Sequence, residues 1–532
     1  EINVFQLGLY AQDKWTVSDK LNLTLGLRID VPFFMTDLQS NDKVAAETYR
    51  DGIKIDVSKY PNAKPQFSPR FGFNYKPFDD ENGSLQIRGG TGLFTGTPPY
   101  VWISNQAGNN GVLFGDLNVR AVKDKNDNII SDGRPSLGFT GNMDTYKPAE
   151  GSATRSDIAI TDPDFKYPSL WKSNIAADYK FGDGWVATVE LLYSKDINAI
   201  YHDNIGLYRT EQFVNDGGAG NARPYYNGYY SDREGNQKAA NHVVMLRNTS
   251  KGHSLYTTFQ LQKNFVDGIL KGLYLNGSYS FGQSRGVTDG TSSVATSAWK
   301  YRAALDGNAE EVGYTAGSFD GRLLLSASYT ANWSKYAATS FGLIYQRYRP
   351  FRYSYCYNGD ANGDSQFSND LMYIPANFDE VKDHLLPGDF DSQEDAWKAM
   401  NAFIEQDPYL SKHRGEYAER NGAVAPFANQ LDLSVSHDIK IYQKNGRSHT
   451  LRFSFNIANF LNLLNRNWGV VQTTVLGNQQ YQFLTIPKGQ GPSAANNYTL
   501  KYMMAKDLDE TFKDNLNDVS RWQMQFGIKY IF

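Results

Sequence analysis

An acidic, amide-rich segment is the part of this sequence whose residue types best fit metal chemistry. Asp360, Asn362 and Asp364 alternate along it, Gln366 follows at the same spacing, and Asp370 ends it. Side-chain oxygens at the first, third and fifth positions of a loop, with a backbone carbonyl at the seventh, wrap a hard cation. The segment therefore predicts a calcium site formed by these five residues.

Two departures from this pattern leave an alternative open. Ser365 stands at the sixth position, where calcium loops usually have glycine, and Leu371 rather than an acid fills the twelfth. The alternative is a surface loop whose Asp and Asn side chains accept hydrogen bonds from their own backbone turns. Calcium is the only cofactor that the sequence suggests.

Catalytic chemistry has no comparable pattern in this chain. The 7 histidines are scattered without an HExxH motif, and Cys356 is the only cysteine. The run Gly90-Thr91-Gly92 lies in a predicted strand and precedes no phosphate-cradling helix. With 53 basic and 57 acidic residues, nothing favours a nucleic-acid partner. We therefore predict no enzyme activity and no binding of nucleic acid.

The elements that position these residues are predicted to be β-strands. From Leu21 to Val31, apolar and polar residues alternate with a period of two, which a helix would scatter around its circumference. About thirteen such segments, each of roughly 10–13 residues, recur along the chain. They start near residues 4, 21, 67, 85, 169, 185, 254, 273, 321, 337, 429, 448 and 521.

The connections between these strands alternate between short and long. The short ones are residues 17–20, 79–84, 182–184, 266–272, 334–336 and 443–447. The long ones are residues 32–66, 96–168, 202–253, 286–320, 349–428 and 461–520, and the fifth contains a predicted helix at Ser392–Gln406. Short turns on one side and long loops on the other are typical of outer-membrane barrels.

Hydropathy agrees with a barrel although its average is polar. The mean hydropathy is −0.53, and no run of about 18 apolar residues predicts a transmembrane helix. Strands of about 11 residues fit a tilted bilayer crossing, whereas the strands of a β-sandwich average about five or six. Aromatic residues cluster near the short turns as an interfacial girdle would: Trp15, Tyr75, Tyr179, Phe181, Trp185, Phe265 and Trp333.

The fold predicted from these patterns is an all-β, transmembrane, antiparallel β-barrel with long extracellular loops. Polar residues in the strands should then face the lumen, where they line a substrate path or a hydrated wall: Arg28, Asp30, Arg70, Arg88, Lys172 and Arg452. We expect the aromatic residues of the loops at 225–230 and 353–357 to pack within the loops rather than to stack on a ligand. We expect the predicted helix to pack on neighbouring loops rather than to dock a partner protein.

Several stretches together resemble the TonB-dependent outer-membrane transporters, most closely the Oar-like proteins of Bacteroidota. The matching segments are residues 8–30, 67–75, 88–96, 358–375, 420–439, 453–469 and 522–532. The last of these is similar to the C-terminal signature that barrel-assembly machinery recognises, with Met524, Phe526, Ile528, Tyr530 and Phe532 at alternate positions.

The resemblance implies a receptor in the Gram-negative outer membrane that takes up a ligand past a plug, driven by TonB. It implies a barrel of about 22 strands, so residues 1–532 would be its C-terminal portion, and the plug and about nine strands would lie upstream. A surface lipoprotein is a further possible partner. Two alternatives remain open, namely a structural, adhesive or secretion-associated barrel platform and a soluble all-β carbohydrate-active protein.

Overall fold

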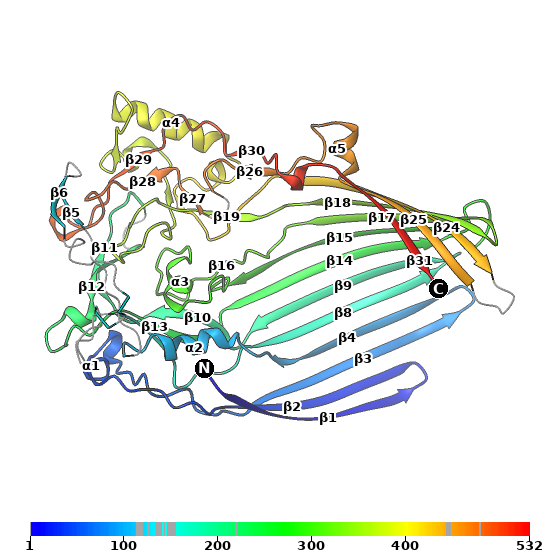
Figure 1. The fold of residues 1–532 in the computed structure, drawn as a ribbon, viewed down its shortest axis with the longest axis horizontal. Helices are drawn as coiled ribbons and strands as arrows, with labels where there is room; N and C mark the ends of the chain where they lie inside the picture. Colours follow the sequence, from blue (N-terminus) through cyan, green and yellow to red (C-terminus); the bar gives the residue numbers. More distant parts are fainter. Residues whose placement is uncertain are drawn as a thin grey trace.

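One large antiparallel sheet dominates the structure (Figure 1). The computed structural model describes all residues except 1, 113–120, 125–127, 133–140, 143, 146–155, 219–221, 443–447 and 478–479. In this described part the sheet has 14 strands, of which β16 (Gly313–Tyr314) pairs only with β15. The other strands follow one another in chain order: β1 (Val4–Ser18), β2 (Leu21–Phe34), β3 (Gln66–Asp80), β4 (Gly83–Thr95), β8 (Ser169–Phe181), β9 (Trp185–Asp196), β14 (Gly252–Asn264), β15 (Leu273–Gly286), β17 (Arg322–Ser334), β18 (Ala337–Tyr348), β24 (Ala428–Tyr442), β25 (Ser448–Ala458) and β31 (Gln523–Ile531).

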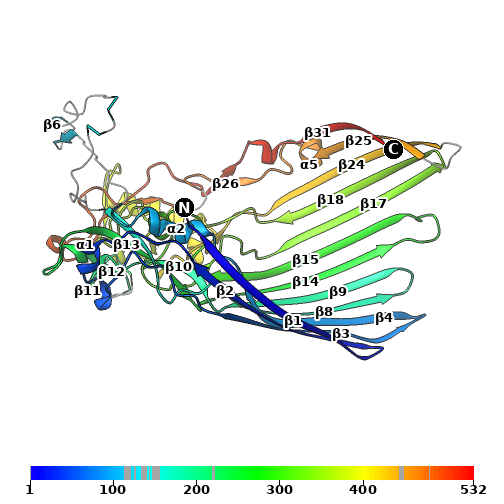
Figure 2. The ribbon, with the colours of Figure 1, turned by 60° about the horizontal axis from the view of Figure 1, so that its bottom comes forward.

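The strands confirm the positions predicted from alternation. Each of the thirteen begins within two residues of its predicted start, and each pairs antiparallel with the next. The tight turns gather at one end of the sheet and the long connections at the other, as Figures 1 and 2 show. Aromatic side chains are exposed beside the tight turns, where Trp15 is 57% and Trp333 68% accessible. This placement fits the predicted girdle.

The register puts all the polar wall residues on one face of the sheet. Directly opposed residues of an antiparallel pair share a face, as do residues two apart along a strand. Same-face pairs connect the sheet from β2 to β31: Arg28–Ser68, Arg70–Gly92, Gly92–Lys172, Lys172–Ser194, Ser194–Ser254, Ser254–Ser284, Ser280–Arg322, Leu324–Gln346, Gln346–Gln430, Asp438–Arg452 and Arg452–Lys529. We call this side the polar face.

The opposite side, the apolar face, carries large exposed hydrophobic side chains along the whole sheet. Examples are Leu25, Ile175, Leu191, Phe259, Leu325, Leu343 and Phe453, each at least 40% accessible. A water-soluble protein rarely exposes so large a contiguous apolar surface. A sheet with one such face and one polar face is the wall expected of a membrane barrel, with lipid outside and a polar lumen inside.

The long connections fold into a cap at one end of the sheet (Figure 2). The cap comprises the described parts of residues 35–65, 96–168, 197–251, 287–321, 349–427 and 459–522. Its helices are α1 (Asp42–Ala46), α2 (Tyr100–Gly108), α3 (Ala295–Lys300), α4 (Gln393–Gln406) and α5 (Phe460–Leu464), with 3₁₀ turns η1 (Arg50–Gly52), η3 (Tyr230–Asp232), η4 (Phe378–Glu380), η5 (Leu410–Lys412), η6 (Ala494–Asn496) and η7 (Asp518–Ser520).

Small sheets hold the segments of the cap together. One sheet of three strands consists of β10 (Ala199–Asn204), β13 (Ala240–Thr249) and β7 (Ser156–Thr161), in which β13 and β7 are parallel. The remaining strands are β5 (Ala121–Lys123), β6 (Ile129–Asp132), β11 (Leu207–Phe213), β12 (Pro224–Tyr229), β19 (Arg352–Tyr355), β20 (Tyr373–Ile374), β21 (Leu385–Leu386), β22 (Glu416–Tyr417), β23 (Ala423–Val424), β26 (Gln472–Thr474), β27 (Gln480–Tyr481), β28 (Leu484–Thr485), β29 (Tyr502–Met504) and β30 (Phe512–Asp514).

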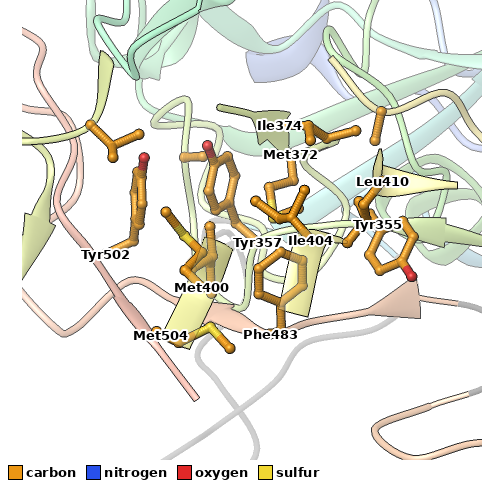
Figure 3. Packing of buried hydrophobic residues seen from close by; sticks show 14 of the residues in the cluster. Tyr355, Tyr357, Met372, Ile374, Met400, Ile404, Leu410, Phe483, Tyr502 and Met504 are labelled. Carbon is orange, nitrogen blue, oxygen red and sulfur yellow. The ribbon is translucent and has the colours of Figure 1, made fainter. Parts of the chain in front are cut away.

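The cap has its own hydrophobic core. Its largest cluster draws buried residues from three long connections, 197–251, 349–427 and 459–522. Figure 3 shows Met400 and Ile404 of α4 gathered with Tyr357 and Phe483. Within the described residues, no helix is both long and apolar enough to cross a bilayer.

Candidate functional site

Ion pairs lie on the polar face near both edges of the sheet, on β2 and on β24 and β25. On β2, Arg28 Nε lies 2.8 Å from Asp30 Oδ2, and the Asp30 side chain is almost fully buried. On β25, Arg452 forms a two-pronged pair with Asp438 of β24, at 2.6 and 2.8 Å. Water reaches the arginines of both pairs, whose side chains are 40% and 43% accessible, and this weakens the contribution of each pair to stability. Their charges instead set the electrostatic potential that a ligand would meet along this face.

A further charged group lies on the polar face around Arg88 of β4. Its Nε lies 2.9 Å from Asp178 Oδ2, and its Nη2 lies 3.7 Å from Glu190 Oε2. The Arg70 guanidinium lies 4.6 Å from the centre of the Phe94 ring. Lys172 lies on the same face, directly opposite Gly92 and Ser194. The structure thus places all six predicted lumen residues on one face, and the lining of a substrate path remains a prediction.

The acidic loop is folded by its own side chains. Asp360 Oδ1 accepts hydrogen bonds from the Asn362 and Gly363 amides, and its Oδ2 accepts one from Ser365. Asn362 Oδ1 accepts from the Asp364 amide. These turns fit the alternative of a self-capped loop, but calcium loops also use them to aim their oxygens. In the described residues, no three His, Cys, Asp or Glu side chains are grouped to hold a metal ion.

The last acid of this loop has a partner that the sequence did not reveal. Arg223 is fully buried, and its Nη1 lies 3.0 Å from Asp370 while its Nε lies 3.0 Å from Asp216. Burial raises the pKa of Asp370 to about 7, and the Arg223 charge opposes that rise. Burial alone would lower the pKa of Arg223, but the two carboxylates outweigh it and raise that pKa. The three residues form what we call the Arg223 network.

Five of the seven tyrosines in the predicted aromatic clusters pack inside the cap, as predicted. Tyr353, Tyr355 and Tyr357 are at most 1% accessible and lie in the main core cluster. The Tyr355 hydroxyl donates to Asp407 at 2.6 Å. Tyr225 and Tyr226 are also buried. None of these five rings is exposed enough to stack on an incoming ligand.

Helix α4 confirms the prediction of a capped, packed helix. Ser392 is its N-cap, accepting from the Asp395 amide at 3.1 Å, and the Ser392 hydroxyl donates to the Asp395 carboxylate. Met400, Phe403 and Ile404 are buried in the core cluster. The face predicted to be apolar therefore packs within the cap, which leaves it no room for a partner.

Replacing Ser392 by alanine is expected to destabilise α4 by about 1 kcal/mol, because the first helical amides lose their side-chain acceptor. Hydrogen exchange of the 393–397 amides in the folded protein would measure this change. Ser392→Asp is the matched control, since aspartate is an equally good N-cap. Equal exchange in the wild type and the alanine variant would contradict a capping role.

The predicted barrel-assembly signature lies on the free edge of the sheet. Met524, Phe526, Ile528 and Tyr530 stand opposite Ile457, Phe455, Phe453 and Leu451 of β25 on the apolar face. Phe526 and Ile528 are 78% and 74% accessible. Phe532 follows the end of β31, at the end of the sheet with the tight turns (Figure 1). Recognition by assembly machinery stays a prediction.

Three solved structures illustrate what the chain is similar to. The crystal structure of BauA, the ferric preacinetobactin receptor from Acinetobacter baumannii, is 10% identical with a TM-score of 0.39, covering 99% of this chain and 43% of that one. The siderophore receptor PirA from Acinetobacter baumannii is 8% identical with a TM-score of 0.40, covering 86% and 42%. The FrpB iron transporter from Neisseria meningitidis is 11% identical with a TM-score of 0.37, covering 86% and 41%.

The chain spans less than half the length of each of these three proteins, and nothing about its own ligand follows from them. None of the curated proteins matches the chain. The decisive comparison is with a family model described as the outer membrane beta barrel domain, which matches residues 1–492. Together with the two-faced sheet, this match rules out the soluble carbohydrate-active alternative. The chain belongs to the outer-membrane β-barrel domain family and is an antiparallel barrel of the Gram-negative outer membrane.

Proposed function

We propose that this protein is a receptor that carries a ligand through a plugged barrel when TonB delivers energy to it. The observation that carries the proposal is the polar face, which bears ion pairs from β2 to β25 and meets a folded cap at one end. These charges lie on the wall that would face the lumen of the barrel. A transported polar ligand needs them, since they replace its water as it passes.

The direction of the edge strands supports the proposal that further strands complete the barrel. Because the thirteen strands pair antiparallel in sequence, β1 and β31 run in the same direction. They cannot close an antiparallel barrel by pairing with each other, and an open sheet edge cannot face lipid. An odd number of additional strands between them satisfies both conditions. We propose that upstream strands of the same protein supply them, together with the plug and the segment that contacts TonB.

The test compares what cells take up. A strain that lacks the protein, a strain that lacks TonB activity and the wild type would grow in the same medium, and mass spectrometry would follow the depletion of its components. We expect at least one compound that the wild type removes from the medium and that neither mutant strain removes. If both mutants deplete every compound like the wild type while the wild-type barrel is folded in the outer membrane, the transport proposal fails.

A structural or adhesive platform is the second candidate, and one observation favours it. The aromatic clusters of the cap are used in packing, so the cap is a stable folded body rather than a set of open binding loops. A platform of this kind would hold a partner, such as a surface lipoprotein, on the cap. Copurification of such a partner without any TonB-dependent uptake would favour the platform over the receptor.

A further inference from the structure

We propose that residues 360–369 of the cap bind one calcium ion. The ligands would be the side chains of Asp360, Asn362, Asp364 and Asn369 and the backbone carbonyl of Gln366. All of these are oxygen donors, which calcium prefers. The inference is independent of transport, because it concerns how the cap is held together.

The first argument is a buried carboxylate without a cation. Asp364 is 1% accessible, and within the described residues it forms no ion pair. Its Oδ1 accepts only the Gln366 amide at 2.8 Å. The buried Arg223 pairs with Asp216 and Asp370 and not with Asp364. A buried charge is costly unless a counterion or a metal compensates it.

The second argument is an oxygen that lacks a partner beside that carboxylate. Asn369 is 2% accessible, and its Oδ1 forms no hydrogen bond to any residue that the structure describes. Its amide group lies against Asp364, with 3.4 Å between Asn369 Nδ2 and Asp364 Oδ2. The buried Asn362 Nδ2 likewise has no partner in the described part of the chain. Buried polar atoms without partners are rare. Flipping the Asn369 amide would exchange its nitrogen and oxygen and bring the free oxygen to an ion beside Asp364.

The backbone resolves one departure from the calcium pattern. Ser365 stands where calcium loops usually have glycine, because that position needs a positive φ. In the structure Ser365 has a φ of 66° and takes up this conformation despite its side chain. The loop therefore turns at the sixth position as a calcium loop does, and the serine does not argue against the site.

The second departure changes the ligand set. The sequence pattern assigned Asp370 as a ligand, but the structure turns its Oδ1 to Arg223 and its Oδ2 to the Ala361 amide. We therefore replace Asp370 by its neighbour Asn369 in the proposed site. This leaves two carboxylates among the ligands, consistent with the absence of any three-carboxylate group in the described residues.

The loop lies against strand β12, so a bound ion would link two segments of the cap. The Tyr226 amide of β12 donates to the Asn362 carbonyl at 2.8 Å, and the Tyr225 ring lies beside Gly363. An ion at the loop would hold residues 360–369 against β12. The nearby Tyr225 ring also provides a probe, since an excited tyrosine can sensitise the luminescence of a terbium ion bound in place of calcium.

The test uses the full-length protein, folded in detergent without lipopolysaccharide and freed of metal by chelation. We expect sensitised terbium luminescence that saturates at one ion per chain and is displaced by calcium. Asp364→Asn keeps the shape but removes a charged ligand, and it should weaken binding by at least about tenfold. Asp379→Asn, which changes an exposed acid elsewhere in the cap, is the matched control and should bind like the wild type.

Folding is checked separately, so a failed variant cannot mimic lost binding. Heat-modifiable migration in gels would show that each barrel is folded, and Asn369→Leu offers a second variant without any change of charge. The proposal fails if the folded wild type binds no terbium or calcium. It also fails if Asp364→Asn and Asn369→Leu, both folded, bind as tightly as the wild type.

Discussion

Replacing Arg223 by methionine is expected to destabilise the cap by about 3–5 kcal/mol while the barrel remains folded. The methionine keeps much of the volume of the arginine but leaves Asp216 and Asp370 buried without their cation, each at 1% side-chain accessibility. Removing one partner of a buried ion network costs far more than the network contributed. The rings of Tyr357 and Tyr417, which lie 5.6 and 5.5 Å from the guanidinium carbon, would also lose their contact with it.

Hydrogen exchange would localise this loss. We expect faster exchange in β12 and β19, which flank the Arg223 network, and unchanged exchange in the barrel strands. Lys398→Met is the matched control, because its ion pair with Asp395 lies on the surface with 75% of the lysine side chain accessible. That change should leave exchange in the cap as it is in the wild type, since exposed pairs contribute little.

A compensated variant separates charge from packing. The triple change Arg223→Met, Asp216→Asn and Asp370→Asn removes the whole network, and replacing a buried ion network by neutral groups is often tolerated. We expect this variant to recover much of the stability lost by Arg223→Met. If the triple variant is no more stable than the single one, the loss comes from packing around the side chain and not from the unpaired carboxylates.

The strands of the wall could be predicted because each carries its own signal. In β2, six apolar residues from Leu21 to Val31 alternate with polar ones, and the period of two alone fixes both the strand and its faces. Helix α4 was predictable for a similar local reason, since Ser392 and Asp395 mark its start and three buried residues follow at helical spacing. These elements contain enough residues for a pattern to repeat.

The interior of the cap could not be predicted, because its order comes from contacts between distant segments. Strands such as β19, β23 and β27 have two to four residues each, too few to show a period. They exist because β19 pairs with both β23 and β27, which lie far from it in the sequence. The Arg223 network has the same origin, since Arg223 and Asp370 are 147 residues apart. No spacing in the sequence marks such a pair.

The second large effect on stability is expected when an arginine is placed on the apolar face of the sheet. Phe259 lies near the middle of β14, is 46% accessible, and stands between Tyr279 and Val189 on that face. Phe259→Arg is expected to destabilise the folded barrel by about 2–4 kcal/mol, because a charge would face hydrocarbon near the bilayer midplane. Loss of the stacked contact with Phe281, at 6.2 Å between ring centres, adds to this effect.

The adjacent residue provides the control for this experiment. Gln260 points to the polar face, where it donates to Asn276 at 2.7 Å. Gln260→Arg adds the same charge one residue further along, so any difference between the two variants reports the face and not the charge. Denaturant titrations of the full-length protein in lipid vesicles would measure both. The assignment of the faces is wrong if Gln260→Arg lowers the stability as much as Phe259→Arg, or more. The apolar face would then not face lipid, and the lumen would lie on that side of the sheet.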